Sequence, residues 1–135
     1  MRYVLFLVLV ALVVSAPAAN ANAEEQELTS IDTVVLFPPD VATPGPKIAP
    51  LLEQVAAVLR AHPSVRVEVA GHCDDHEMVE VAYARANLVA SGLAARGVPR
   101  ERTVVATYGT TRPLGSNKTE EGRAKNRRVD FKVLR

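Results

Sequence analysis

The chain has 135 residues, of which 48% are hydrophobic, and its 16 lysines and arginines almost balance its 15 acidic residues. A formal net charge of +1 excludes a broad electrostatic attraction to nucleic acid or to anionic lipid. The single cysteine excludes an intramolecular disulfide, so the fold must be stabilised by one modest hydrophobic core.

The N-terminus has the pattern of a secretory signal peptide. Arg2 precedes an apolar run over residues 4–14, and two A-x-A matches follow, at 19–21 and 21–23. The apolar run is shorter than the ~20 residues that cross a bilayer. We therefore predict that residues 1–23 are a signal peptide cleaved after Ala23 or Ala21, and that the mature chain has no membrane span; the alternative is an uncleaved anchor.

The next segments predict a short lead-in, a strand and a helix. Residues 24–30 are polar and are expected to be flexible, so the folded domain is predicted to span 31–135. Residues 33–37 are rich in β-branched and aromatic side chains, which favours a strand. Prolines then exclude regular structure until a helix begins near Pro46 or Lys47, and it should end near Ala61 because Pro63 disfavours a helical His62.

The second half continues the alternation of strands and helices. Valines at 65, 67 and 69 alternate with polar residues and predict a strand that ends at Gly71. A helix is expected over 75–96, closed by Gly97 and Pro99, followed by a strand near 104–106. A loop at 110–115, a short helix at 119–125 and a strand at 129–133 complete the order β-α-β-α-β-(short α)-β. We predict an α/β fold, a two-layer α/β sandwich with a mixed sheet.

One charged residue stands on the apolar face of the second helix. A helical wheel places Arg85 among the apolar side chains of Met78, Val81, Ala82, Leu88, Val89 and Leu93. A guanidinium there needs an anion, and a carboxylate held through two hydrogen bonds suits it best. Asp74, at the exit of the second strand, is the nearest candidate in sequence. Two structural alternatives remain: a buried ion pair, or an Asp74 N-cap completed by Glu77 in a capping box.

Several motifs resemble the OmpA-like domain family. The closing stretch runs from Tyr108-Gly109-Thr110-Thr111-Arg112-Pro113 through Asn117 and Thr119 to Glu121-Gly122-Arg123-Ala124-Lys125-Asn126-Arg127-Arg128-Val129. Upstream, Val35-Leu36-Phe37 with Asp40, Gly71-His72-Cys73-Asp74, Ala84-Arg85-Ala86-Asn87 and Gly97-Val98-Pro99 follow in the family's order. The resemblance covers about residues 31 to 134.

This resemblance implies a non-enzymatic periplasmic domain that holds peptidoglycan through the diaminopimelate of its stem peptide. By similarity, Asp74 binds the amino group and Arg85 the carboxylate, with accessory contacts from Asp40, Cys73 and Arg128. The resemblance also implies that the protein is associated with the cell wall or the outer membrane, with envelope proteins as further partners. The loop between Asp74 and Arg85 is about four residues shorter than is usual in the family and lacks a ligand-contacting asparagine. The alternative is therefore a degenerate domain that acts as a structural or protein-interaction module.

Other chemistry is less well supported by the residues. The run 72–76 contains five potential metal ligands, but neighbouring strand residues face opposite ways and no second cluster accompanies them, so no metal or cofactor is predicted. A thiol hydrolase would need Cys73 and His72 to converge, which strand neighbours cannot do. The basic run 123–128 could suggest nucleic acid, but export and neutral charge favour pairing with Glu120 and Glu121 instead.

Overall fold

A computed structural model describes residues 18–31 and 33–134, so most of the predicted signal peptide lies outside the described residues. The described helices are α1 (Ala18–Thr29), α2 (Ile48–Ala61), α3 (Glu80–Ala94) and α4 (Glu120–Asn126), with a 3₁₀ turn, η1, at Arg100–Arg102. The described strands are β1 (Val34–Leu36), β2 (Arg66–His72), β3 (Thr103–Gly109) and β4 (Arg128–Leu134). From β1 onward, this order matches the order predicted from the sequence.

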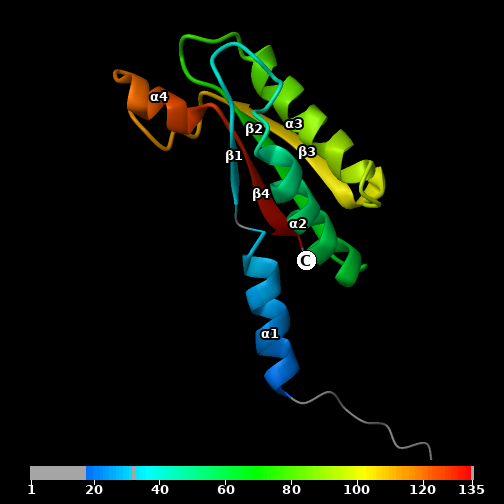
Figure 1. The fold of residues 1–135 in the computed structure, drawn as a ribbon. Helices are drawn as coiled ribbons and strands as arrows, with labels where there is room; N and C mark the ends of the chain where they lie inside the picture. The colour runs from blue at the N-terminus through cyan, green and yellow to red at the C-terminus, as the bar shows by residue number, and fades with distance from the viewer. Residues whose placement is uncertain (1–17, 32, 135) are drawn as a thin grey trace, which may run out of the picture.

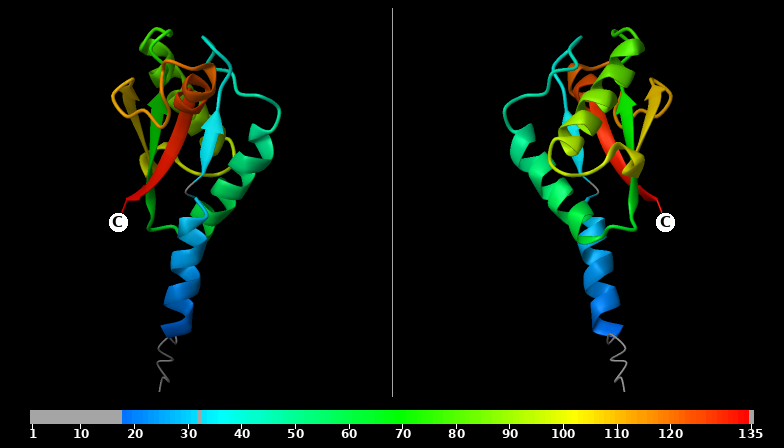
Figure 2. Two further views of the ribbon diagram at one scale, coloured as in Figure 1. Left: turned by 90° about the vertical axis from the view of Figure 1, so that its left-hand side faces the viewer. Right: turned by 90° about the vertical axis from the view of Figure 1, so that its right-hand side faces the viewer.

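The four strands form one mixed sheet in the order β1-β4-β2-β3. β2 and β3 are parallel, whereas β4 runs antiparallel to both β1 and β2. Helices α2 and α3 cover the same face of the sheet, as the views of Figure 1 and Figure 2 show together. The predicted two-layer α/β sandwich is therefore confirmed.

The core lies between this sheet face and the two long helices. Alternating residues of β2 and β4 supply the sheet side of the core, including Val67, Val69, Val129 and Phe131. At Gly71, near the end of β2, a Cβ atom would lie 1.8 Å from the carbonyl oxygen of Ala82 in α3. The strand end and the start of α3 can therefore touch only because residue 71 has no side chain.

The ends of the helices agree with the sequence except at the start of α3. Helix α2 begins directly after Lys47, and Gly97 has a left-handed φ of 87° just beyond α3. Helix α3 begins at Glu80 rather than near residue 75, because residues 75–79 form turns that place Met78 at 72% exposure. Leu88 is 38% exposed as well, so the predicted apolar face was wrong at these two positions. Arg85, in contrast, is completely buried.

The lead-in differs from its predicted flexibility, because residues 24–29 belong to helix α1. Leu28 and Ile31 are buried in the core, and Glu27 lies 2.8 Å from the ring of His62 at the end of α2. These contacts give the segment a fixed position against the domain. Within residues 18–31 and 33–134, no helix has both the length and the apolar character that a membrane span requires.

Candidate functional site

The predicted site residues lie at one end of the sheet. The exit of β2, the turns over residues 75–79 and the loop over residues 38–45 come together there, at the end of the domain that lies away from α1 (Figure 1). Helix α3 then runs back along the sheet, so a residue in its first turns faces the loop that follows β1. Asp74 and Arg85 both lie in this region and are 2% and 0% exposed.

Arg85 is held by contacts from three segments. Its Nε donates to the carbonyl of Val41 at 2.9 Å, Nη1 donates to the carbonyl of His72 at 3.1 Å, and Nη2 donates to that of Pro38 at 3.0 Å. The two remaining N–H groups donate to the two carboxylate oxygens of Glu77, with Nη1 and Oε1 2.9 Å apart. Every N–H group of the guanidinium is therefore used inside the protein.

Glu77 is the carboxylate that the sequence required opposite Arg85. Its side chain is 1% exposed and forms a two-pronged ion pair with the guanidinium. Asp74, the nearest candidate by sequence, does not contact the Arg85 side chain, because Glu77 comes from the turn between them. Sequence reasoning named Glu77 only as a capping residue, since nothing in the sequence shows which way the turn folds.

Asp74 is paired with a different arginine. Its Oδ2 accepts from Nη1 of Arg127 at 3.0 Å, and its Oδ1 accepts from the backbone N–H of His76 at 2.8 Å. Arg127 also donates to Glu120 at 2.8 Å. Burial alone would lower the pKa of Arg127, but the hydrogen bonds to Glu120 and Asp74 outweigh burial and raise it. Arg127, the residue that precedes the predicted accessory Arg128, is therefore the arginine that contacts Asp74.

The capping alternative is partly present in the turn. The backbone N–H of Asp74 donates to Oε1 of Glu77 at 3.1 Å, which is half of a capping box. The other half is replaced, because the Asp74 carboxylate accepts from His76 instead of from residue 77. This turn precedes helix α3, whose own N-cap, Val79, has no side-chain cap.

Two of the three accessory residues also lie in this region. Asp40 has a left-handed φ of 62°, and its backbone N–H donates to Oε2 of Glu77 at 2.8 Å. Cys73 is 1% exposed, and burial together with the nearby Glu77 raises the pKa of its thiol. A buried thiol with a raised pKa is a poor nucleophile, which argues against the hydrolase alternative.

Arg128 lies on the opposite face of the sheet from the helices. It is 2% exposed, donates from Nε to Asp130 at 3.1 Å and from Nη2 to the carbonyl of Arg112 at 2.9 Å. His72 Nε2 lies 3.1 Å from the same Asp130 carboxylate, although the two groups do not meet the geometry of a hydrogen bond. Burial would raise the pKa of Asp130, but His72 and Arg128 outweigh burial and lower it. The geometry therefore separates Arg128 from Asp74 and Arg85.

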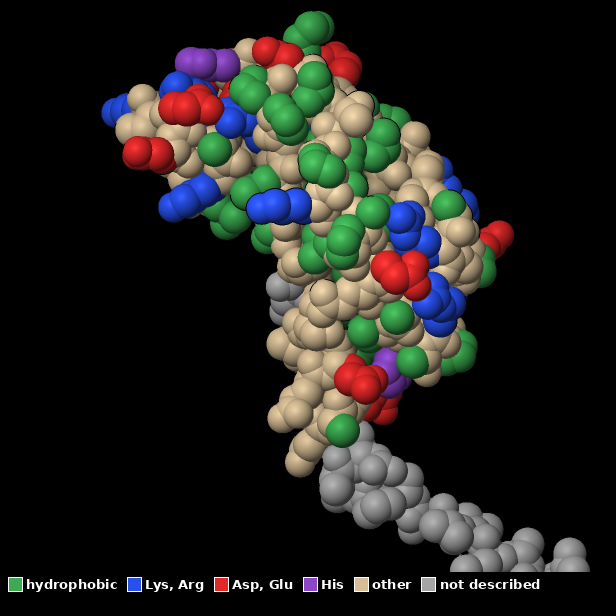
Figure 3. All heavy atoms as spheres, viewed as in Figure 1, with side chains coloured by type: hydrophobic (Ala, Val, Ile, Leu, Met, Phe, Trp, Pro, Cys, Tyr) green, Lys and Arg blue, Asp and Glu red, His purple; other side chains and the backbone are tan. Residues whose placement is uncertain are grey.

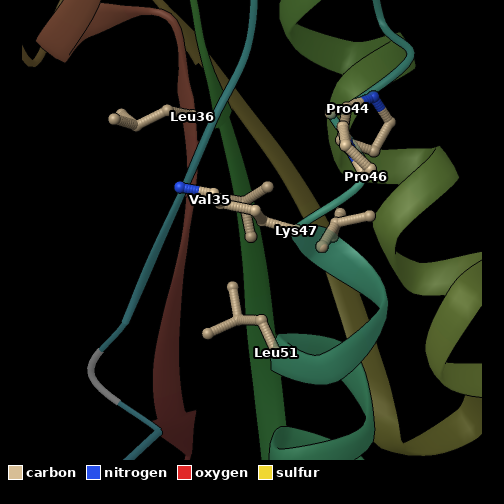
Figure 4. Close-up of a pocket in the computed structure, with 8 residues that line it drawn as sticks. Val35, Leu36, Pro44, Pro46, Lys47 and Leu51 are labelled. Atoms are coloured by element: carbon tan, nitrogen blue, oxygen red, sulfur yellow. The ribbon is translucent and has the colours of Figure 1, made fainter.

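Two grooves lie on the described surface of the domain. One, of about 420 Å³, lies between the start of α3 and the end of β3 and is lined by Tyr83, Tyr108, Glu80 and neighbouring threonines. The other, of about 300 Å³, lies between β1 and α2, where Val35 and Leu51 point into it (Figure 4). Apolar side chains gather over the upper part of this side of the molecule (Figure 3). The first groove offers hydroxyl groups beside the candidate site, whereas the second is almost entirely apolar.

The remaining clusters have structural roles in the described part of the chain. Residues 18–31 and 33–134 contain no group of three or more histidine, cysteine or acidic side chains placed to hold a metal ion. In the basic run, Arg123 and Arg127 both pair with Glu120, as the sequence predicted for that carboxylate. The hydrogen bond from Arg127 lowers the pKa of Glu120.

The chain is an α/β domain with a mixed sheet that two helices cover on one face (Figure 1), and buried charged residues lie at the exit of β2. The model of the OmpA family matches residues 36–127. The chain belongs to the OmpA family.

Named relatives agree with this assignment. The chain is 35% identical over 123 residues to "Peptidoglycan-binding protein ArfA" of Mycobacterium tuberculosis, covering 87% of this chain and 38% of that one. It is 38% identical over 100 residues to "Peptidoglycan-associated lipoprotein" of Legionella pneumophila, covering 71% and 57%. The crystal structure of the peptidoglycan-associated lipoprotein from Burkholderia pseudomallei superposes with a TM-score of 0.71 at 26% identity, covering 75% and 89%. The chain thus spans less than two thirds of the length of the two curated relatives.

Proposed function

We propose that this protein is a non-enzymatic module that holds peptidoglycan non-covalently in the periplasm. The observation that carries the proposal is that a buried anion, Asp74 at the exit of β2, and a buried cation, Arg85 in α3, occupy one end of the sheet in a chain of the OmpA family. Relatives named for peptidoglycan binding or association support the same ligand.

The finer part of the proposal is that diaminopimelate of the stem peptide is the group bound. A zwitterionic amino-acid head is best held by one fixed anion and one fixed cation, which Asp74 and Arg85 provide. The neighbouring groove with Tyr83, Tyr108 and threonine hydroxyls suits the polar remainder of a glycan-linked peptide. Asp40 contacts Glu77 and Cys73 directly precedes Asp74, so both lie close to the proposed site, whereas Arg128 would act only indirectly through β4.

Co-sedimentation with purified sacculi tests the coarse proposal on the unmodified protein. The wild type should sediment with sacculi, and free diaminopimelate should release it, whereas lysine, which lacks the second carboxylate, should release little. Folded wild-type protein that stays in the supernatant would contradict wall binding. Release by lysine and diaminopimelate alike would leave wall binding intact but remove the diaminopimelate site.

Variants locate the site once binding is measured. Arg85→Ala should abolish sedimentation, because truncating one partner of a charge-assisted contact costs about 2–5 kcal/mol, roughly 30-fold or more in affinity. Arg100→Ala is the matched control, since Arg100 is an exposed arginine that donates to Asn87 and Ser91. Circular dichroism must show that both variants keep their fold, and equal retention of binding in both would place the site elsewhere.

One observation favours a second candidate function. All N–H groups of Arg85 are satisfied within the chain, which is what a purely structural ion pair would show. In that case the domain would be a structural or protein-interaction module in the envelope. A folded wild type that ignores both sacculi and diaminopimelate, and melts at the same temperature with and without them, would favour this function.

A further inference from the structure

Glu77 is a buried side chain in an otherwise exposed turn. Its neighbours Asp75, His76 and Met78 are all exposed, yet the Glu77 side chain is only 1% exposed. Short turns normally direct charged side chains to water, so the inward direction of Glu77 must be stabilised by its contacts.

Those contacts form a complete carboxylate receptor. Oε1 accepts from Nη1 of Arg85 at 2.9 Å and from the backbone N–H of Asp74 at 3.1 Å. Oε2 accepts from Nη2 of Arg85 and from the backbone N–H of Asp40 at 2.8 Å. We call these donors the carboxylate cradle: the two Nη groups of Arg85 and the amides of Asp40 and Asp74. Each carboxylate oxygen in it accepts two N–H groups, a geometry that any carboxylate could use.

We propose that Glu77 is a specificity-determining residue that occupies the carboxylate cradle in the free protein and is displaced when a ligand carboxylate enters. This inference rests on the proposed function, because it names how the diaminopimelate carboxylate gains access to Arg85. The other anchors of Arg85 are the carbonyls of Pro38, Val41 and His72, which can stay in place during the exchange. Only one side chain, carried by a surface turn, has to move.

The exchange has a direct effect on affinity. A competitor tethered within the chain acts at an effective concentration of about millimolar or higher, so it competes strongly with a free carboxylate. The apparent affinity equals the intrinsic affinity multiplied by the fraction of molecules in which the cradle is open. Wall attachment by this chain is therefore weakened by its own Glu77, and removing that side chain should tighten binding by about tenfold or more.

The exchange also selects the ligand. Displacing Glu77 leaves an unpaired carboxylate next to Asp74, and the exposed Asp75 and Glu80 lie in the same stretch. A simple carboxylate would add a further negative charge there, whereas a zwitterion brings an ammonium group that offsets it. The displaced Glu77 thus favours amino-acid head groups over plain acids.

The test uses Glu77→Ala, with Glu101→Ala as the matched control because Glu101 is an exposed glutamate in η1, outside the candidate site. The substitution keeps Cβ and removes Cγ and the carboxylate of Glu77, and acetate has these same heavy atoms. Acetate at constant ionic strength, with chloride as reference, should raise the melting temperature of Glu77→Ala but not that of the wild type or of Glu101→Ala. Calorimetry with free diaminopimelate should show at least about tenfold tighter binding to Glu77→Ala than to the wild type.

The outcomes separate this inference from the proposed function. If the wild type binds sacculi and diaminopimelate, but Glu77→Ala neither binds more tightly nor responds to acetate, the role of Glu77 is refuted while wall binding stands. If acetate stabilises Glu77→Ala but no protein binds diaminopimelate or sacculi, the cradle is real and the proposed function fails. Should Glu77→Ala unfold, restoration of its fold by acetate supports the cradle, and failure of acetate to restore it rejects the proposal.

Discussion

Arg127 and Asp74 are 53 positions apart in the sequence and form a buried ion pair with 3.0 Å between Nη1 and Oδ2. The pair connects the junction of α4 and β4 to the exit of β2. Together with the pair of Glu77 and Arg85, it places two cations and two anions in one nearly sealed region. Their charges offset one another, which keeps the candidate site neutral when no ligand is bound.

The first prediction concerns the stability of this region. Arg127→Ala leaves Asp74 buried with only the amide of His76, whereas Asp74→Ala leaves Arg127 paired with Glu120. Breaking a buried pair costs about 3–5 kcal/mol, so we expect Arg127→Ala to reach that range and Asp74→Ala to cost less. Urea unfolding measures both. Glu120→Ala is the control and should cost least, because the Glu120 side chain is exposed to water; an equal loss in all three variants would contradict this ranking.

The second prediction concerns the contact between β2 and α3. Gly71→Ala would place a Cβ atom 1.8 Å from the Ala82 carbonyl oxygen, so the helix must move away from the strand end. We expect a loss of about 1–3 kcal/mol or more, measured by thermal unfolding. Gly45→Ala is the matched control, because a Cβ atom at residue 45 would have no other atom within 4 Å. A Gly71→Ala protein as stable as Gly45→Ala would show that the contact is loose.

The third prediction concerns the thiol of Cys73. Because burial raises its pKa, less thiolate is present at a given pH than in the unfolded chain. A thiol reagent at about pH 8, close to the ordinary pKa of a cysteine, should therefore react far more slowly with native protein than with urea-unfolded protein. Cys73→Ser and Cys73→Thr should leave sacculus binding nearly intact, and loss of binding in both folded variants would require a metal or redox role.

The fourth prediction concerns pH and Asp130. Its pKa is lowered in the folded protein, so its stabilising effect is present above the unfolded value of about 3.9 and disappears as the pH falls through the folded value. Asp130→Asn should reduce stability near neutral pH by under about 1 kcal/mol, because the side chain is partly screened by water. Melting curves from neutral to strongly acidic pH should show this difference closing in acid. The exposed Asp75→Asn is the control, and a difference that grows in acid would contradict the assignment.

The fifth prediction concerns the N-terminus of the exported protein. Cleavage after Ala21 or Ala23 leaves a chain that begins at Asn22 or Glu24, and either product keeps Leu28 and the contact of Glu27 with His62. Mass spectrometry of protein recovered from the envelope should find one of these two N-termini. Recovery of intact Met1 would support the uncleaved anchor.

Much of the fold followed from local patterns. Alternating valines located β2, the prolines before Ile48 located the start of α2, and Gly97 located the end of α3. The start of α3 was misplaced by about five residues, because the stretch 75–79 is compatible with a helix and only its tertiary contacts hold it in turns. The helix of residues 24–29 was missed for a similar reason, since it depends on Leu28 and Ile31 reaching the core.

By itself, the sequence determined that a charge had to be compensated on an apolar helix face, because burying Arg85 without an anion is prohibitively costly. It also determined the family, through motifs that extend along nearly the whole domain. Only the tertiary structure decided which carboxylate pairs with which arginine: Glu77 pairs with Arg85, and Asp74 pairs with Arg127. The physical reason is that ion-pair choice depends on the path of a short turn and on a partner 53 residues away, and neither leaves a periodic signal in the sequence.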